Sequence, residues 1–155
     1  MQETSRIDRK ALNIGSPVFK VGTTIPERYT CEGKDMNPPL EIGNIPAEAK
    51  SLVLIVDDPD APRGTWLHWL VWNIPIVNRI NENEVPGVQG LNSFGRIAYG
   101  GPCPPSGTHR YYFKVYALNR FLDLAEGATL KEVDTAMQSH VIAYGEVVGL
   151  YKKQG

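Results

Sequence analysis

Three strongly apolar runs stand out along the chain, and each has the composition of a buried β-strand. They span residues 52–56, 68–74 and 109–118, and each adjoins a loop rich in Gly or Pro. Alternate side chains of a strand share a face, so each run should align one polar residue with apolar ones. The predicted alignments are Asp58 with Leu52, Leu54 and Val56; His68 with Leu70, Trp72 and Ile74; and His109 with Tyr111, Phe113, Val115 and Ala117. We therefore expect a polar side chain at one end of each buried strand.

The spacing of these runs predicts that their polar tips meet. The loop of residues 57–67 is too short for a helical crossover, so the first two strands should pair antiparallel. If the third strand runs in the same direction as the second, all three tips reach one edge of the sheet. The predicted site is a concave pocket walled by the loop of residues 99–107, with four polar residues around it: Asp58, His68, His109 and Tyr111.

Shorter apolar stretches and turn residues predict the rest of the architecture. The chain carries 12 prolines and 15 glycines, spread at frequent intervals between short β-prone runs. This punctuation favours an all-β sandwich or barrel over alternating β and α units. We expect residues 1–12 to be loosely packed and residues 78–87 to form an exposed excursion. The remaining expected strands are 17–21, 40–42 and 146–152.

One helix is marked near residues 130–142. Thr129 and Glu132 match a capping box, in which each side chain bonds the backbone N–H of the other residue. The helix should end before Gly145. Apolar residues recur at helical spacing behind this start: Leu130, Val133, Met137 and Val141.

Length and charge narrow the class of protein. A chain of 155 residues fits a single domain, 1–155, around one core. The net charge of −1, with Lys and Arg scattered, argues against a nucleic-acid groove or a polybasic membrane surface. The first residues lack the apolar core of a signal peptide, and no run reaches membrane-spanning length. We therefore expect a cytoplasmic protein with no nucleic-acid partner and no integral membrane segment.

The predicted pocket has the chemistry of an anion site. A carboxylate beside an imidazole favours the charged imidazolium, so Asp58 should strengthen the proton affinity of His68 or His109. The imidazolium can then donate hydrogen bonds to an anion. The sequence GGPCPPSG at residues 100–107 adds backbone amides in a loop where glycines allow close approach, which suits an oxyanion or a phosphate. Arg110 has the opposite parity and should be a structural ion-pair or surface residue.

Two enzyme alternatives use the same residues. Two histidines and a carboxylate could form a facial triad for a metal, although their positions on separate strands neither support nor exclude it. A hydrolase would need Asp58, a histidine and a nucleophile such as Ser106, but the chain has no G-x-S-x-G elbow. We therefore expect a binding protein rather than an enzyme.

The two cysteines, Cys31 and Cys103, both lie in Gly/Pro-rich loops. The default for a cytosolic protein is two reduced thiols, and a disulfide is the alternative if the source is a hyperthermophile. The chain has no C-x-x-C pattern of the kind that binds zinc. The sequence therefore predicts no metal and leaves the pairing of the thiols open.

The sequence as a whole resembles the phosphatidylethanolamine-binding protein family, in its short bacterial and archaeal members, also called Raf-kinase-inhibitor-like proteins. The resemblance covers residues 18–153 and implies a mainly β fold, a β-sandwich of two antiparallel sheets with short peripheral helices. It is carried by five segments: YTCEGKDMNPPLEI (29–42), DDPDAP (57–62), WLHWLVWNIP (66–75), GGPCPPSGTHRYYFKVYAL (100–118) and HVIAYGEVVGLYKK (140–153).

This resemblance also implies a function. The family's pocket holds phosphate, phosphorylethanolamine or a similar lipid head group, so we expect a non-enzymatic binding or regulatory protein with a phosphate-containing ligand and no cofactor. A kinase or serine protease as protein partner stays open, with serine protease inhibition as an alternative function, and the prokaryotic members suggest a homodimer. Asp60 is equally suited to bonding its own loop. By resemblance the ligand-binding residues are Asp58, Asp60, Pro62, Trp66, His68, Gly101, Cys103, His109 and Tyr111.

Overall fold

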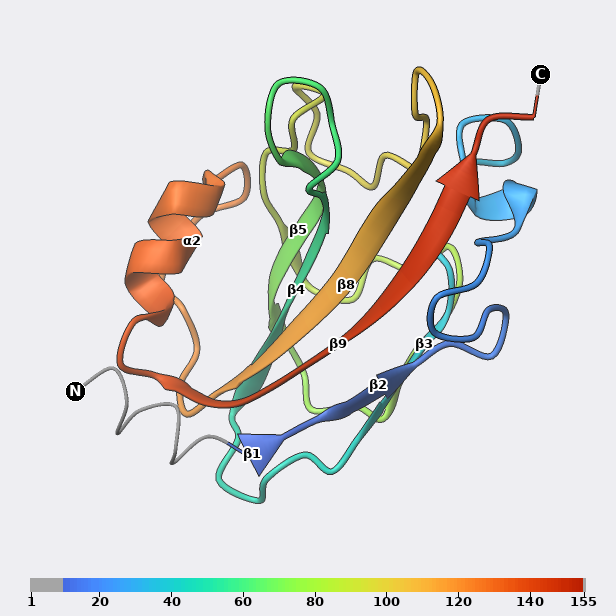
Figure 1. Cartoon of the computed structure of the whole chain (residues 1–155). Helices are drawn as coiled ribbons and strands as arrows, with labels where there is room; N and C mark the ends of the chain where they lie inside the picture. The colour runs from blue at the N-terminus through green and yellow to red at the C-terminus, as the bar shows by residue number, and fades with distance from the viewer. Residues whose placement is uncertain (1–9, 155) are drawn as a thin grey trace.

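The β-prone runs pair into two sheets, which a computed structural model describes over residues 10–154 (Figure 1). Within that range the larger sheet has six strands in the order β1-β9-β8-β4-β5-β7, and the smaller has three in the order β2-β3-β6. All pairs are antiparallel except β1 with β9. The predicted mainly β sandwich is confirmed. The elements are β1 (Lys10–Ala11), β2 (Asn13–Gly15), a 3-10 turn (Glu27–Tyr29), β3 (Leu40–Gly43), β4 (Ser51–Asp58), β5 (Trp66–Ile74), β6 (Arg79–Ile80), β7 (Val88–Gln89), β8 (Thr108–Leu118), α2 (Leu130–Met137) and β9 (Val141–Lys152).

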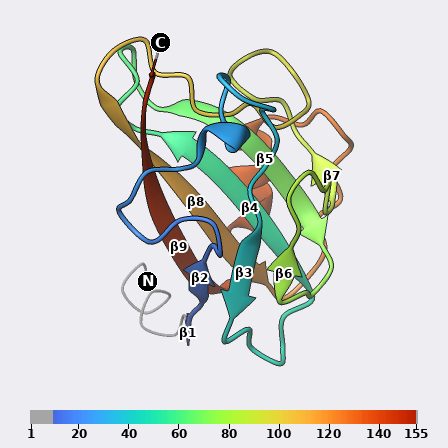
Figure 2. The same cartoon turned by 90° about the vertical axis from the view of Figure 1, so that its right-hand side faces the viewer.

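The larger sheet is the middle of three layers. The smaller sheet covers one of its faces, and helix α2 covers part of the other (Figures 1 and 2). The side chains of β4 divide accordingly: Leu52, Leu54 and Val56 lie in the main core between the sheets. Val53 and Ile55 pack in a second cluster beneath the helix. Because both faces of β4 are buried, its sequence is a continuous apolar run rather than an alternating one.

Helix α2 begins at the predicted capping box. The Thr129 hydroxyl accepts the Glu132 N–H at 3.2 Å, and the Glu132 carboxylate accepts the Thr129 N–H at 2.9 Å. The helix ends at Met137, earlier than the apolar spacing suggested. The reason is that Ser139 adopts a left-handed conformation (φ 71°), which turns the chain into β9. Val141 therefore joins the cluster beneath the helix from the first position of a strand, and this strand is longer than expected.

Two other expectations differ from the structure. Residues 17–21 form no strand, and the chain turns at Gly22 (φ 75°). At that point the Gly22 N–H donates to the Val148 carbonyl at 2.8 Å. Residues 78–87 are not wholly exposed, because β6 lies within them and Ile80 is buried against the main core.

The start of the described chain is tied to the larger sheet. Of the residues expected to be loosely packed, 1–9 lie outside the described part of the chain. Lys10 and Ala11 pair with β9, and Leu12 is buried in the main core. Leu12 is also anchored through its backbone, because its N–H donates to the Tyr144 carbonyl at 2.9 Å. The expectation of loose packing is therefore wrong for residues 10–12.

Candidate functional site

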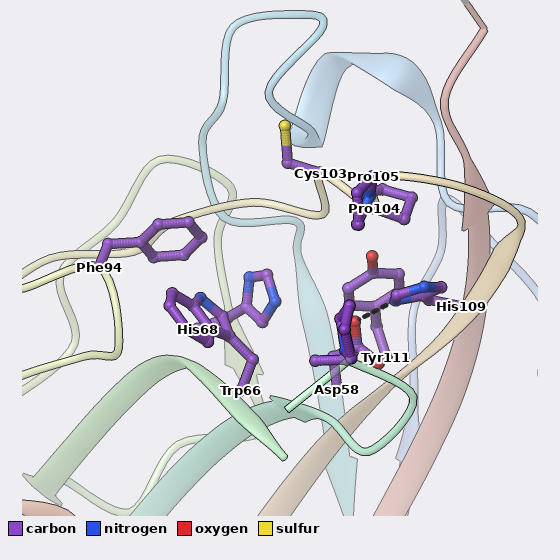
Figure 3. Close-up of a pocket in the computed structure, with 11 residues that line it drawn as sticks. Asp58, Trp66, His68, Phe94, Cys103, Pro104, Pro105, His109 and Tyr111 are labelled. Atoms are coloured by element: carbon purple, nitrogen blue, oxygen red, sulfur yellow. Dashed lines mark hydrogen bonds and ion pairs between the residues drawn. The ribbon is translucent and has the colours of Figure 1, made fainter. Parts of the chain in front are cut away.

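The strand order brings the predicted polar tips together. Strand β4 lies between β5 and β8 and is antiparallel to both, so β5 and β8 run in the same direction. Their first residues therefore reach the end of β4, where Asp58, His68, His109 and Tyr111 surround one cavity (Figure 3). Tyr111 also has the predicted parity, because it shares the main core with Phe113. The predicted meeting of these residues is confirmed, and ligand binding by them stays a prediction.

A β-bulge places His68 at this cavity. Val56 pairs with Trp69, and the next residue of β4, Asp57, pairs with Leu67. His68 is therefore an extra residue on β5, left between two ladder pairs. The bulge lets two neighbours face the same side of the sheet: His68 lines the cavity, and Trp69 lies in the main core.

The same bulge corrects the predicted parity of β5. Leu70 and Trp72 were expected to share the face of His68, but both pack in the cluster beneath the helix. A second register shift lies near Asn73, which has a left-handed backbone (φ 54°), and Ile74 then lies in the main core. Simple alternation therefore predicts the wrong face for residues of β5, because each extra residue in the strand switches the side chains that follow it to the opposite face of the sheet.

The cavity has a volume of about 230 Å³, and prolines and aromatic rings form much of its wall (Figure 3). Trp66 and Phe94 stand at its rim, each 38% exposed, with their rings edge to face at 5.5 Å between centroids. Seven of the nine predicted ligand residues are among those that line it. The lining residues are Asp58, Ala61, Pro62, Trp66, His68, Phe94, Cys103, Pro104, Pro105, His109 and Tyr111.

Asp58 and His109 form a buried pair in the cavity wall. His109 Nδ1 lies 2.6 Å from Asp58 Oδ2, and both residues are buried. Because an ionised carboxylate only accepts hydrogen bonds, Nδ1 carries the proton. The other carboxylate oxygen of Asp58 accepts the Asp60 N–H at 2.8 Å, which fixes the loop after β4. Within residues 10–154, His109 Nε2 has no hydrogen-bond partner, so this atom is available to a ligand.

His68 is held in a different state. Its Nδ1 lies 2.7 Å from the Gly100 carbonyl oxygen, which can only accept, so Nδ1 carries the proton here as well. Burial lowers the pKa of His68 below its ordinary value, and this outweighs the opposite effects of the Gly100 carbonyl and the Asp58 charge. Asp58 therefore favours the charged form of His68, as expected, but burial outweighs it and the net shift of the pKa is downward.

Tyr111 carries an unusual hydroxyl group. The residue is fully buried, and its hydroxyl oxygen has no hydrogen-bond partner among the described residues. Its ring lies edge to face with the His68 ring, 5.3 Å between centroids. Burial, and next the charge of Asp58, raise the pKa of Tyr111 against the smaller opposite effect of the Cys103 backbone, so the hydroxyl keeps its proton. The hydroxyl thus lies close to the Asp58 carboxylate and the Cys103 backbone but makes no hydrogen bond of normal geometry to the described residues.

Two residues of the predicted ligand set do not line the cavity. Asp60 forms a two-pronged ion pair with Arg110, with Oδ1 to Nη2 at 2.7 Å and Oδ2 to Nε at 2.9 Å. This hydrogen bonding lowers the pKa of Asp60 to about 2, and Arg110 has the structural role that its parity predicted. The Gly101 N–H donates to Asp35 Oδ1 at 2.7 Å, so that amide is not free for an anion.

A disulfide joins Cys31 to Cys103, which is the alternative to two reduced thiols that the sequence left open. The fold brings together two loops separated by 72 residues. Beside the bond, the Cys31 N–H donates to the Pro102 carbonyl at 3.1 Å. A Cβ at Gly101 would lie 2.4 Å from the Tyr29 carbonyl oxygen, so only glycine fits this approach. The wall loop of the cavity is therefore firmly anchored on its outer side.

The metal and hydrolase alternatives depend on side chains that the structure describes. Among residues 10–154, no three His, Cys, Asp or Glu side chains gather closely enough to hold a metal ion. Ser106 is exposed and does not line the cavity.

Within residues 10–154 no helix has the length and apolar character needed to cross a membrane.

Comparison with known proteins identifies the family. The profile described as phosphatidylethanolamine-binding protein (PEBP) matches residues 15–152. The chain therefore belongs to the PEBP family. A UPF0098 protein of Pyrococcus horikoshii is 51% identical over 158 residues, which cover 95% of this chain and 79% of that protein. A UPF0098 protein of Methanothermobacter thermautotrophicus is 45% identical over 150 residues, covering 92% and 99%.

Solved structures agree with this assignment. A putative PEBP homologue from Chlamydia trachomatis has 45% sequence identity and a TM-score of 0.90, covering 94% of this chain and 99% of that one. YbcL of Escherichia coli, described as a new member of the mammalian PEBP family, has 30% identity and a TM-score of 0.84, covering 92% and 99%. The two-sheet fold that forms the cavity is thus the fold of the family.

Proposed function

We propose that this protein binds a small oxyanion, such as phosphate or a phosphorylethanolamine-like group, in the cavity and performs no chemistry on it. The observation that carries the proposal concerns Tyr111, a residue that lines the cavity and whose hydroxyl oxygen is buried without a hydrogen-bond partner among the described residues. A buried polar group without a partner costs the folded state about 1–3 kcal/mol. An oxygen atom of a bound ligand would offset that cost by accepting the hydrogen bond.

His109 adds a second group on the same side of the cavity. Its Nδ1–H is committed to Asp58, and this bond fixes the orientation of the ring and therefore of Nε2. Hydrogen bonds to a charged group are typically worth about 1.5–3 kcal/mol each. When Nε2 also carries a proton, the His109 imidazolium donates from it to a bound anion, and Tyr111 and His109 then provide a rigid pair of contacts.

The dimensions of the cavity favour a head group over a larger molecule. Its volume of about 230 Å³ lies below the range of roughly 300–1,000 Å³ for pockets that hold drug-sized ligands. Trp66 and Phe94 at the rim would contact the apolar part of a ligand whose charged end lies inside.

Binding without chemistry is supported by the state of the candidate nucleophiles. Cys103 lines the cavity, but its sulfur is held in the disulfide and offers no thiolate. Ser106 lies in solvent on the wall loop. Neither side chain is prepared to attack a ligand, so the cavity supports recognition rather than turnover.

The test is calorimetric titration with inorganic phosphate and phosphorylethanolamine at pH 6. We expect saturable binding to the unmodified protein, and a loss of about tenfold or more in Tyr111→Phe, because one hydrogen bond to a charged group is removed. His109→Ala should weaken binding similarly. The matched control is Tyr151→Phe, since the Tyr151 hydroxyl is bonded to Glu32 at 2.6 Å and lies outside the cavity lining.

The titration also has results that contradict the proposal. Absence of binding by the unmodified protein would refute an oxyanion site. Equal affinities for the unmodified protein and a folded Tyr111→Phe variant would remove the observation on which the proposal rests.

A further inference from the structure

The cavity contains a carboxylate and no basic side chain of the usual anion-binding kind. Asp58 lines it, and none of the lining residues is Lys or Arg. Arg110 is committed to Asp60 outside the lining, and the Arg96 guanidinium lies over the outer rim residue Phe94, 5.6 Å from its ring centroid. A fully ionised oxyanion placed here would meet the negative charge of Asp58 without a guanidinium or ammonium group beside it.

His68 adds a second acceptor to the cavity. With its proton on Nδ1 and donated to Gly100, the neutral ring presents Nε2 as an unprotonated acceptor. Nε2 has no hydrogen-bond partner within residues 10–154. The ring is fixed by edge-to-face contacts with Phe94 and Tyr111, each 5.3 Å between centroids. This atom therefore calls for a donor from the ligand.

The charged and titratable groups around His68 are consistent with a neutral ring. They are Asp58 from β4, His109 and Tyr111 from β8, and Asp35 from the loop after the 3-10 turn. Burial lowers the pKa of His68 by more than the backbone of Gly100 and Gly101 and the charges of Asp58 and Asp35 raise it. At neutral pH the ring therefore accepts at Nε2 rather than donating there.

We propose that the cavity selects oxyanions that keep a proton of their own, namely the monoanion of phosphate or of a phosphate monoester, over anions without such a proton, such as sulfate. The P–O–H group of the ligand donates to His68 Nε2, and another ligand oxygen accepts from the Tyr111 O–H. Asp58 then faces one negative charge instead of two. This inference rests on the oxyanion site of the proposed function and adds its selectivity.

The first test compares two ligands of similar shape on the unmodified protein. Methylphosphonate and (difluoromethyl)phosphonate differ in their second pKa, because fluorine withdraws electrons and lowers it. Affinity is measured by calorimetry from pH 5 to pH 8. If the bound form is the monoanion, the pH at which affinity falls follows the pKa of each ligand. If it falls at the same pH for both, a protein group is titrating and the inference is overturned.

The second test compares phosphate with sulfate at pH 6. We expect phosphate to bind about 10- to 100-fold more tightly, the usual effect of one hydrogen bond to a charged group. In His68→Asn the amide can still donate to Gly100, but the acceptor at Nε2 is gone, so the ratio should fall towards one. His140→Asn is the control, because His140 directly precedes β9, whereas the cavity residue His109 pairs with Tyr151 near the other end of that strand.

The outcomes separate the selectivity from the site itself. Equal binding of phosphate and sulfate by the unmodified protein overturns the selectivity and leaves the oxyanion site in place. Absence of binding by both anions, and by phosphorylethanolamine, refutes the site. An unchanged ratio in a folded His68→Asn variant that still binds phosphate shows that His68 is not the acceptor and overturns the inference.

Discussion

Replacing Tyr111 by Phe should stabilise the free protein while it weakens the binding of oxyanions. The hydroxyl is fully buried and has no partner among the described residues, so it is desolvated in the folded state and hydrated in the unfolded one. The cost of such a group is about 1–3 kcal/mol. Tyr111→Phe keeps the ring that packs against His68 and removes this cost, so the free energy of unfolding should rise by roughly 1 kcal/mol or more.

Tyr151 provides a matched comparison. Its side chain is as deeply buried, but its hydroxyl donates to the Glu32 carboxylate at 2.6 Å. Tyr151→Phe removes a bond to a charged group, and the free energy of unfolding should therefore fall by about 1.5–3 kcal/mol. The same substitution, Tyr to Phe, should thus raise the free energy of unfolding at position 111 and lower it at position 151, because only the Tyr151 hydroxyl has a hydrogen-bond partner among the described residues.

Urea denaturation in phosphate-free buffer measures both effects. The transition midpoint should move up for Tyr111→Phe and down for Tyr151→Phe, with the slope m unchanged if the transitions are two-state. Added phosphate should raise the midpoint of the unmodified protein more than that of Tyr111→Phe, because the ligand binds only the folded state. A Tyr111→Phe variant destabilised as much as Tyr151→Phe would refute the reasoning, since it would mean that the hydroxyl already has a partner.

Three further predictions concern the surroundings of the cavity. The pKa of Asp60 is lowered from 3.8 to about 2 by Arg110, so the ion pair stabilises the fold above about pH 4 and is lost as pH falls through 2; Asp60→Asn should flatten that part of the acid dependence of the urea midpoint. The pKa of His68 lies below 6.5, so the unfolded chain takes up this proton first and stability should fall as pH drops below about 6.5; His68→Asn should reduce that slope, and an unchanged slope would contradict it. Joint replacement of Cys31 and Cys103 by Ser removes the covalent link between two residues 72 positions apart and should lower the free energy of unfolding by roughly 2–4 kcal/mol. A decrease below about 1 kcal/mol would mean that the non-covalent contacts of the loop of residues 99–107 are sufficient to hold it in place.

The parts of the site that lie on regular strands could be predicted from the sequence. Strand β8 keeps strict alternation, so His109 and Tyr111 were correctly placed with Phe113. The short connection after β4 fixed the antiparallel pairing and brought Asp58 and His68 to the same end of the sheet. These inferences succeed because they depend on local geometry and on loop length.

Other features depend on contacts between distant segments and leave no local pattern. The bulge at His68 arises from pairing with β4, so alternation along β5 alone could not reveal it. Phe94 lies in an irregular segment, and only the folded loop places it at the cavity. Cys31 meets Cys103 across 72 residues. The partner of the loop residue Asp60 is Arg110 on β8, and this contact is not visible in the loop sequence, so the family resemblance alone placed Asp60 in the ligand set.

The central claim is most directly tested by an NMR titration that follows the imidazole nitrogens as inorganic phosphate is added. The signals of His68 and His109 should shift together and saturate, and the spectrum of His68 should show a proton on Nδ1 and none on Nε2 before phosphate is added. His140, at the other end of β9, should not move. If neither His68 nor His109 responds at any phosphate concentration, the cavity does not bind oxyanions and the account is contradicted.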